Sequence, residues 1–141
     1  MVHNKIFLAL LGASSAHGEA SRKVFTALDL TEGQPKILYL LRLHDGIVQK
    51  ELAEKCNIRQ STLTVLLTKM EAVGLVRKET CYVSGMKRAY RVYLTELGRE
   101  KAEALEVELV RLEEKAFKGF TAEERLKMLK QLAQIEDNLR E

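Results

Sequence analysis

The chain has 141 residues, of which 46% are apolar and 30% are charged, and these proportions fit a single soluble globular domain. A chain of this length buries roughly 68% of its unfolded surface, so it needs no disulfide or metal ion to fold. No stretch approaches the ~20 apolar residues of a membrane-spanning helix, and the two cysteines and three histidines lack the spacing of a disulfide framework or a metal site. We therefore expect a cytoplasmic protein without a metal ion and without membrane association.

Positive charge is concentrated in the middle of the chain. From residue 49 to residue 91 there are nine Lys or Arg and four Glu, a net charge of +5, which leaves −2 for the rest of a chain whose net charge is +3. Such a basic segment is typical of a surface that faces phosphates. An ordinary charged surface is the alternative, and charge alone does not separate the two.

Residues 4–28 are predicted to form a helix whose first turns are apolar on more than one face. A helix that is apolar nearly all round is buried, so we expect this one to pack against a partner. Lys5, the apolar run 6–11 and Ser14-Ser15-Ala16 also resemble a weak secretory signal. The run is short for such a signal, and a helix is the favoured interpretation.

Three further helices follow. The first starts at Thr31 to Pro35, because proline is tolerated in the first turn of a helix, and Asp45-Gly46 ends it. The second spans about residues 49–56, and the third spans about residues 60–73. The inward face of the third helix is formed by apolar residues at helical spacing, namely Leu63, Leu66, Leu67, Met70 and Val73.

The periodicity then changes to that of strands. Residues 75–79 and 90–94 are predicted strands, and the second is rich in the aromatic and β-branched residues that strands prefer. Ser84-Gly85 is a turn signal between them. We therefore expect a β-hairpin whose tip carries Lys87 and Arg88.

Two long helices complete the chain. Thr95 caps the first, which runs to about Phe117 and carries a short seam of coiled-coil type, Leu105, Leu109, Leu112 and Ala116. Thr121 to Glu124 forms a capping box for the second, whose apolar stripe consists of Leu126, Leu129, Leu132, Ile135 and Leu139. One small domain cannot bury all these stripes, so we expect a homodimer.

The order of these elements predicts a mainly α-helical fold with a small β-hairpin wing, that is, a winged helix-turn-helix with N- and C-terminal dimerisation helices. We treat residues 1–141 as one domain. Within it, residues 30–95 form the winged-helix lobe, and residues 1–28 and 96–141 form the dimerisation helices. The major groove of double-stranded DNA is wide enough to admit one helix of such a lobe.

The helix of residues 60–73 carries small polar side chains near its start, where a helix in the major groove needs them. Ser61, Thr62 and Thr64 can bond to phosphates or base edges, and Val65 can contact a thymine methyl group. Basic residues nearby are predicted to reach phosphates, and those of the hairpin tip the minor groove. The predicted DNA-binding residues are Lys50, Arg59, Gln60, Ser61, Thr62, Thr64, Val65, Thr68, Lys69, Lys87 and Arg88. The alternative is that these side chains only face solvent.

Four runs of the chain carry a family resemblance: Leu30 to Leu38, Gln49 to Thr64, Met70 to Arg77 and Tyr93 to Gly98. As a set they resemble the MarR family of bacterial regulators. The resemblance implies a triangular homodimer that reads a pseudo-palindromic operator. It also implies a pocket between the dimerisation helices and the lobes for a small phenolic or other aromatic effector, whose binding lowers the affinity for DNA. The expected function is thus a ligand-responsive repressor that needs no cofactor.

The chain departs from the family pattern at three positions. The family wing carries Asp-x-Arg, and Arg88 matches the arginine, but Met86 stands at the position of the aspartate, so the support of the wing is altered. Val65 stands where the family often has arginine, which shifts the expected base preference toward thymine methyl contacts. Val48 occupies an N-cap position where Ser or Thr is usual, a loss of about 1 kcal/mol if nothing compensates.

Enzyme chemistry finds no support, and two other functions stay open as alternatives. No Gly-rich phosphate loop, nucleophile–base–acid set or metal site occurs in the sequence. A thiol-based redox-sensing regulator needs an accessible cysteine of low pKa; Cys56 is expected in the core, whereas Cys81 is expected near the base of the wing among basic residues. A winged-helix protein-interaction module is the other alternative.

Overall fold

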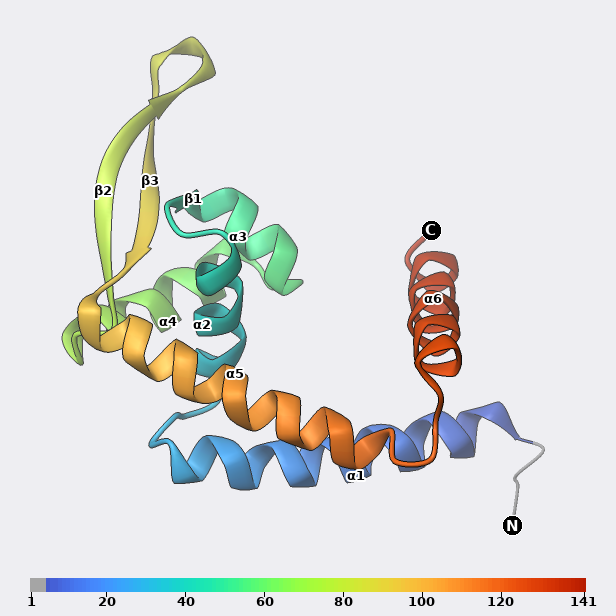
Figure 1. The fold of residues 1–141 in the computed structure, drawn as a ribbon. Coiled ribbons are helices and arrows are strands. Elements are labelled where there is room, and N and C mark those ends of the chain that lie inside the picture. The colour runs from blue at the N-terminus through green and yellow to red at the C-terminus, as the bar shows by residue number, and fades with distance from the viewer. Residues whose placement is uncertain (1–4) are drawn as a thin grey trace. The chain divides into compact units, whose positions relative to one another are not determined.

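The computed structural model describes residues 5–141, which divide into two compact units between Leu109 and Val110. In chain order its elements are α1 (Ile6–Ala27), α2 (Gln34–Leu43), β1 (Ile47–Val48), α3 (Gln49–Cys56), α4 (Gln60–Ala72), β2 (Val76–Val83), β3 (Lys87–Leu94), α5 (Glu96–Ala116) and α6 (Ala122–Leu139) (Figure 1). This mainly helical fold with one small sheet confirms the predicted fold class. Within residues 5–141 no helix is both long and apolar enough to cross a membrane.

The core of the first unit lies between α2, α3, α4 and the base of the sheet. Leu63, Leu67 and Met70 on the inner face of α4 are fully buried, as their helical spacing predicts. They meet buried side chains of the other elements, among them Ile37, Leu38, Leu41, Leu52, Val92 and Leu105. Val73 is exposed, contrary to the prediction, because α4 ends at Ala72 and Val73 is already its cap residue.

The sheet has three antiparallel strands in the order β1-β3-β2. β1 was not predicted from the sequence, because a strand of two residues has no periodicity to detect. It exists because Ile47 pairs with Val92, and Val48 with Arg91, at the base of β3.

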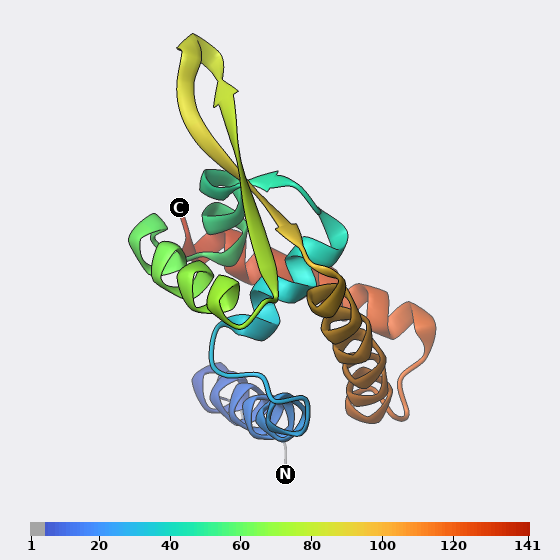
Figure 2. The same cartoon turned by 90° about the vertical axis from the view of Figure 1, so that its left-hand side faces the viewer.

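The hairpin of β2 and β3 is longer than the predicted strands. The two strands pair without interruption from Val76 and Leu94 to Val83 and Lys87. Their inner halves pack on the helices, and the outer half of the hairpin projects beyond them (Figure 2). The predicted tip therefore shrinks to a turn of three residues, Ser84–Met86. Residues 80–83 are of types that favour strands, so the ladder extends, and Lys87 and Arg88 belong to β3 rather than to the tip.

The first turn of α5 packs against the chain just before β2. Thr95 caps α5 as predicted, because its hydroxyl accepts a hydrogen bond from the amide of Gly98 (3.0 Å). A Cβ atom at position 98 would lie 1.9 Å from the carbonyl oxygen of Leu75. Only glycine fits this approach of two backbones.

The α1 helix has two different halves. It runs through Gly12 and Gly18 without a break, and its last turns pack on the core through Val24 and Phe25. The first turn is uncovered, since Ile6 and Phe7 are 70% and 76% exposed.

The second unit contains the end of α5 and the whole of α6. The predicted capping box is present: the Thr121 hydroxyl accepts from the amide of Glu124 at 3.1 Å, and the Glu124 carboxylate accepts from the amide of Thr121 at 2.9 Å. The apolar stripe of α6 is uncovered, with Leu126, Leu129, Leu132, Ile135 and Leu139 between 37% and 79% exposed.

Candidate nucleic-acid interface

The outer face of α4 is exposed along its first three turns. The predicted groove-facing residues on it are all exposed: Gln60, Ser61, Thr62, Thr64, Val65, Thr68 and Lys69. Because the opposite face is buried in the core, α4 presents these side chains from a rigid element.

The hydroxyl groups of α4 are not equally free to bind DNA. The Thr64 hydroxyl donates to the carbonyl of Gln60 (2.9 Å) and accepts from the side-chain amide of Gln49 (2.8 Å). The Thr68 hydroxyl donates to the carbonyl of Thr64 (2.8 Å). Among the described residues Ser61 and Thr62 have no side-chain hydrogen-bond partner, so their donors and acceptors are available to a ligand. The sequence analysis did not distinguish among these hydroxyl groups. It also did not identify Gln49, whose hydrogen bond to Thr64 joins α3 to α4.

The cations around α4 divide into paired and unpaired groups. Lys50, Arg59 and Lys69 are exposed and form no ion pair with any residue from 5 to 141. By contrast, Arg77 pairs with Glu79 (2.5 Å) and Lys78 pairs with Glu71 (3.5 Å). The unpaired group coincides with the residues predicted to reach phosphates.

The first turns of α3 and α4 lack side-chain caps. Val48 and Arg59 occupy the N-cap positions, and neither makes a capping hydrogen bond. The absence of a cap at Val48 agrees with the prediction from its apolar side chain. Uncapped amides at the start of a helix favour an anion, so both ends suit a phosphate.

Both predicted wing cations are exposed on β3. The guanidinium carbon of Arg88 lies 5.5 Å from the ring centroid of Tyr90, a residue that the sequence analysis did not single out. It could have been found, because residues two apart in a strand lie on one face. Met86 is exposed in the turn, where its φ is +61°.

The base of the wing is braced by the turn before β1. The carboxylate of Asp45 accepts a hydrogen bond from the amide of Leu94 (2.9 Å) and pairs with Arg99 of α5 (3.3 Å). The guanidinium of Arg91 donates to the carbonyl of Gly46 (2.9 Å). A turn that the sequence marked only as a helix stop thus ties β3 to α5.

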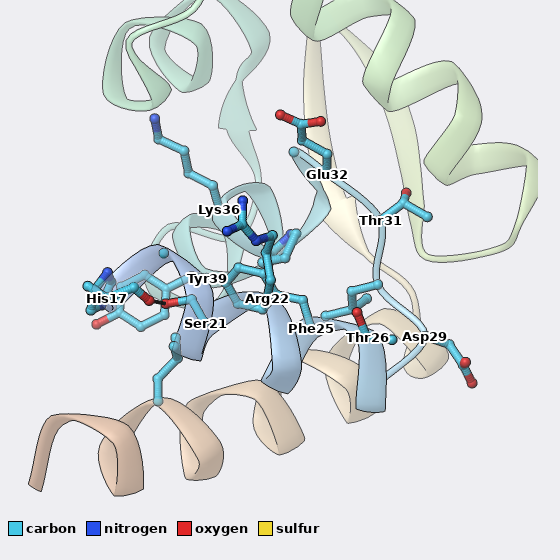
Figure 3. A pocket seen from close by; sticks show the side chains of 15 residues that line it. His17, Ser21, Arg22, Phe25, Thr26, Asp29, Thr31, Glu32, Lys36 and Tyr39 are labelled. Atoms are coloured by element: carbon cyan, nitrogen blue, oxygen red, sulfur yellow. Dashed lines mark hydrogen bonds between the residues drawn. The ribbon is translucent and has the colours of Figure 1, made fainter. Parts of the chain in front are cut away.

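A cleft of about 1100 Å³ lies between α1 and α2. Its walls are largely apolar, with Phe25, Leu30, Pro35, Tyr39 and Leu109 among the lining residues. Its charged lining residues are Arg22 of α1, Lys36 of α2 and two acidic residues, Glu32 and Asp29, and the carboxylate of Asp29 points away from the other labelled side chains (Figure 3).

One side of this cleft lies against α4. Gly33 lines the cleft with φ +88°, and a Cβ atom at this position would lie 3.0 Å from both Cδ atoms of Leu66 in α4. The turn from Thr31 to Gln34 is closed by a hydrogen bond from the Thr31 amide to the Gln34 side chain (3.0 Å). The lining of the cleft at Gly33 therefore lies directly beside Leu66 of α4.

The two cysteines have different environments. Cys56 is fully buried, as predicted, and burial raises the pKa of its thiol, with the charge of Lys36 acting in the opposite direction. Cys81 is half-buried and pairs with Ala89 in the outer half of the hairpin, not near the base as predicted. The reason is the extended ladder, which places residues 80–83 in β2.

Comparison with known proteins gives two sequence findings. The model of the MarR family matches residues 30–82. The chain is 32% identical over 117 residues to the uncharacterized HTH-type transcriptional regulator YybA of Bacillus subtilis, a match that covers 82% of this chain and 75% of YybA.

Two solved structures are similar to the fold. One is the transcriptional repressor CouR bound to a 23-mer DNA duplex, with a TM-score of 0.80 and 23% identity, covering 94% of this chain and 92% of CouR. The other is NadR in complex with 4-hydroxyphenylacetate, with a TM-score of 0.78 and 24% identity, covering 96% of this chain and 94% of NadR. At these identities the likeness is one of fold.

Proposed function

The chain belongs to the MarR family of transcriptional regulators, and on this premise we propose that it is a cytoplasmic homodimeric repressor that releases its operator when a small aromatic effector binds. The observation that carries the proposal is the outer face of α4. There, unpartnered hydroxyls and three unpaired cations surround a helix that the core holds rigidly.

The residues of this interface divide into two roles. Ser61, Thr62 and Val65 read base edges in the major groove, together with Gln60, Thr64 and Thr68. Because the Thr64 hydroxyl is already hydrogen-bonded to Gln49 and Gln60, only its methyl group is available for a base contact. Lys50, Arg59 and Lys69 bind phosphates, and Lys87 and Arg88 reach the adjacent minor groove.

Substitutions on α4 test this division of roles. Duplexes are first selected from a random pool, and dissociation constants are then measured on the selected duplex and on a scrambled one. Thr62→Ala removes a base contact and should cost about 1–3 kcal/mol on the selected duplex only. Thr64→Ala should show the same selectivity through its methyl group. Lys69→Ala should weaken both duplexes nearly equally and reduce the salt slope by about 0.9.

The exposed lysine Lys127 on α6 provides the matched control for Lys69. Lys127→Ala should leave both affinities unchanged. Equal losses for Thr62→Ala, Thr64→Ala and Lys69→Ala on both duplexes would show that the division of roles is wrong. Failure of the wild-type protein to enrich any duplex would favour the protein-interaction module instead.

The homodimer is supported by the uncovered apolar surfaces at the two ends of the chain. The first turn of α1 and the stripe of α6 expose large apolar side chains, and exposed apolar area of this kind marks an interaction site. We assign residues 1–28, of which residues 1–4 lie outside the described part of the chain, and residues 96–141 to dimerisation, and we assign residues 30–95 to the lobe. A two-fold dimer of such units presents two α4 helices to a pseudo-palindrome.

The effector site is the cleft between α1 and α2. Its apolar walls suit an aromatic ring, and Arg22 and Lys36 suit a carboxylate. NadR, which has a similar fold, binds 4-hydroxyphenylacetate, an aromatic carboxylate. Because the turn that lines the cleft at Gly33 lies beside Leu66 of α4, a ligand that displaces this turn would also shift the DNA-binding helix. CouR, a repressor of similar fold, supports repression as the output.

A further inference from the structure

The ring of Tyr90 lies between two cations on one face of the hairpin. β2 and β3 pair Tyr82 with Arg88, and alternate residues of a strand share a face. Toward the turn, the guanidinium carbon of Arg88 is 5.5 Å from the ring centroid of Tyr90; toward the base, Nζ of Lys78 is 5.8 Å from it. Both distances lie within the range of a cation–π contact.

Lys78, the cation nearer the base of the hairpin, is held to α4 by an ion pair. Lys78 is half-buried, and its ammonium group pairs with Glu71 near the end of α4 at 3.5 Å. A continuous series of contacts therefore runs from the outer helix of the lobe through Lys78 and Tyr90 to Arg88. These contacts connect the two predicted DNA-binding elements, α4 and the β2–β3 hairpin.

Arg88 has no carboxylate to orient it. It forms no ion pair with any described residue, and Met86 two positions before it offers only a weakly accepting thioether. Tyr82 and Tyr90 are nevertheless 68% and 38% exposed on a hairpin that has no core to cover them. A partly exposed ring 5.5 Å from an unpaired guanidinium, with a second tyrosine opposite that arginine in the strand pair, is explained if the Tyr90 ring holds the guanidinium.

We propose that Tyr90, assisted by Tyr82 across the strand pair, is the positioning residue that presents Arg88 to the minor groove. This inference rests on the proposed function, because it requires that the wing contacts DNA. The ring restricts the long side chain before binding, so less conformational freedom is lost when the guanidinium enters the groove. The aromatic ring does the work that a hydrogen-bonding side chain at position 86 would do.

The first test is made on the free protein. If the Tyr90 ring holds Arg88, its ring current should shift the Arg88 Hε resonance in a ¹H–¹⁵N spectrum of arginine side chains. We expect Tyr90→Phe to keep this shift and Tyr90→Leu to abolish it, while circular dichroism shows both variants folded. An unshifted Arg88 resonance in the wild-type protein overturns the proposal.

The second test measures binding to selected duplexes whose minor groove beside each half-site is either A·T-rich or G·C-rich. Tyr90→Leu should weaken binding to the A·T-rich duplex about 2- to 5-fold, the size of an exposed cation–π contact, and reduce the preference for A·T. Tyr90→Phe should match the wild type. In an Arg88→Ala background Tyr90→Leu should have no further effect, whereas in a Lys87→Ala background it should retain its full effect.

The outcomes separate this proposal from the proposed function. If the wild-type protein selects no duplex, the proposed function fails, and the positioning role falls with it. If the protein binds DNA but Tyr90→Leu weakens binding equally with and without Arg88, the proposed function stands and the positioning role is overturned. Equal losses for Tyr90→Phe and Tyr90→Leu would overturn it too, because they would assign the effect to the hydroxyl group.

Discussion

The winged-helix lobe and the terminal helices bury their apolar side chains to very different degrees. In the lobe, residues such as Leu38, Leu52 and Leu63 have no exposed area, whereas Phe7 of α1 and Leu129 of α6 are more than half exposed. Both regions have apolar stripes at helical spacing. The difference is that α2, α3, α4 and the sheet supply one another with opposing surfaces. The terminal stripes have no such opposing surface among the described residues of their own unit, and in the proposed homodimer the second subunit supplies it.

The largest expected effect is at the closest backbone approach between α5 and the lobe. Gly98→Ala places a methyl group against the carbonyl of Leu75, and overpacking against backbone should cost roughly 3 kcal/mol of unfolding free energy. Urea denaturation of the purified variant measures it. Gly12→Ala in α1 is the matched control, because nothing lies within 4 Å of the added Cβ, and it should be neutral or stabilise by about 0.5–1 kcal/mol. Similar stability of the two variants would contradict the packing at Gly98.

The next largest effect is expected on dimerisation, and it compares one exposed leucine from each region. Leu129 of α6 is 54% exposed and Leu43 of α2 is 60% exposed. A buried leucine contributes about 1.5–3 kcal/mol, and a two-fold dimer buries two copies. Leu129→Lys should therefore raise the dimer dissociation constant roughly 100-fold or more in analytical ultracentrifugation. Leu43→Lys should leave it unchanged, and the opposite ranking would show that the dimer forms through the lobe.

A smaller effect is expected at the cleft, where α1 meets the lobe. Arg22→Ala removes a cation that can bind an effector carboxylate, a contact of about 1.5–3 kcal/mol. Calorimetric titration with 4-hydroxyphenylacetate should show roughly 10- to 100-fold weaker binding. Asp29→Asn is the control, because this carboxylate points away from the other cleft residues (Figure 3). Undiminished binding by Arg22→Ala would place the ligand elsewhere.

The cysteines give the smallest effect and also test the redox alternative. Cys56 lies in the lobe core with a raised pKa, so at neutral pH a thiol reagent should modify only Cys81 in the native protein. If Cys81 is unreactive under these conditions, the thiol-sensing function is excluded. Rapid modification of Cys56 would show that the lobe opens far more easily than its burial indicates.

The burial of Cys56 also makes the stability of the fold depend on pH, in a direction that the raised pKa determines. The unfolded thiol loses its proton at the ordinary cysteine pKa of about 8.5, whereas burial raises the pKa of the folded thiol, so that it keeps its proton to higher pH. The contribution to stability is therefore present below this pH and is lost as the pH rises through the folded pKa. Urea denaturation should show that wild-type stability falls as the pH rises above the pKa of the unfolded thiol, and that this fall is reduced in Cys56→Ala.

The helices were predictable because their signals are local. The bounds of α3 and the capping of α5 and α6 follow from residues three or four apart, and neighbours in sequence are neighbours in a helix. The outward face of α4 followed by elimination once its apolar face was identified. The family motifs lie in these same regular segments.

What the sequence could not determine depends on partners that lie in other elements of the fold. β1 exists only through Val92 and Arg91, the hairpin extends only because residues 80–83 find residues 87–90, and the Thr64 hydroxyl is occupied only because α3 brings Gln49 to it. The series from Glu71 to Arg88 spans three elements.

The sequence by itself therefore determined which segments are helices, which faces are apolar and which residues could read DNA, since each follows from spacing of a few residues. Only the tertiary structure decided which hydroxyls are free, how Arg88 is held and which apolar faces remain uncovered. Those properties depend on which surface packs against a residue. The spacing of residues in the sequence shows that a helix has an apolar face, but it does not show what covers that face.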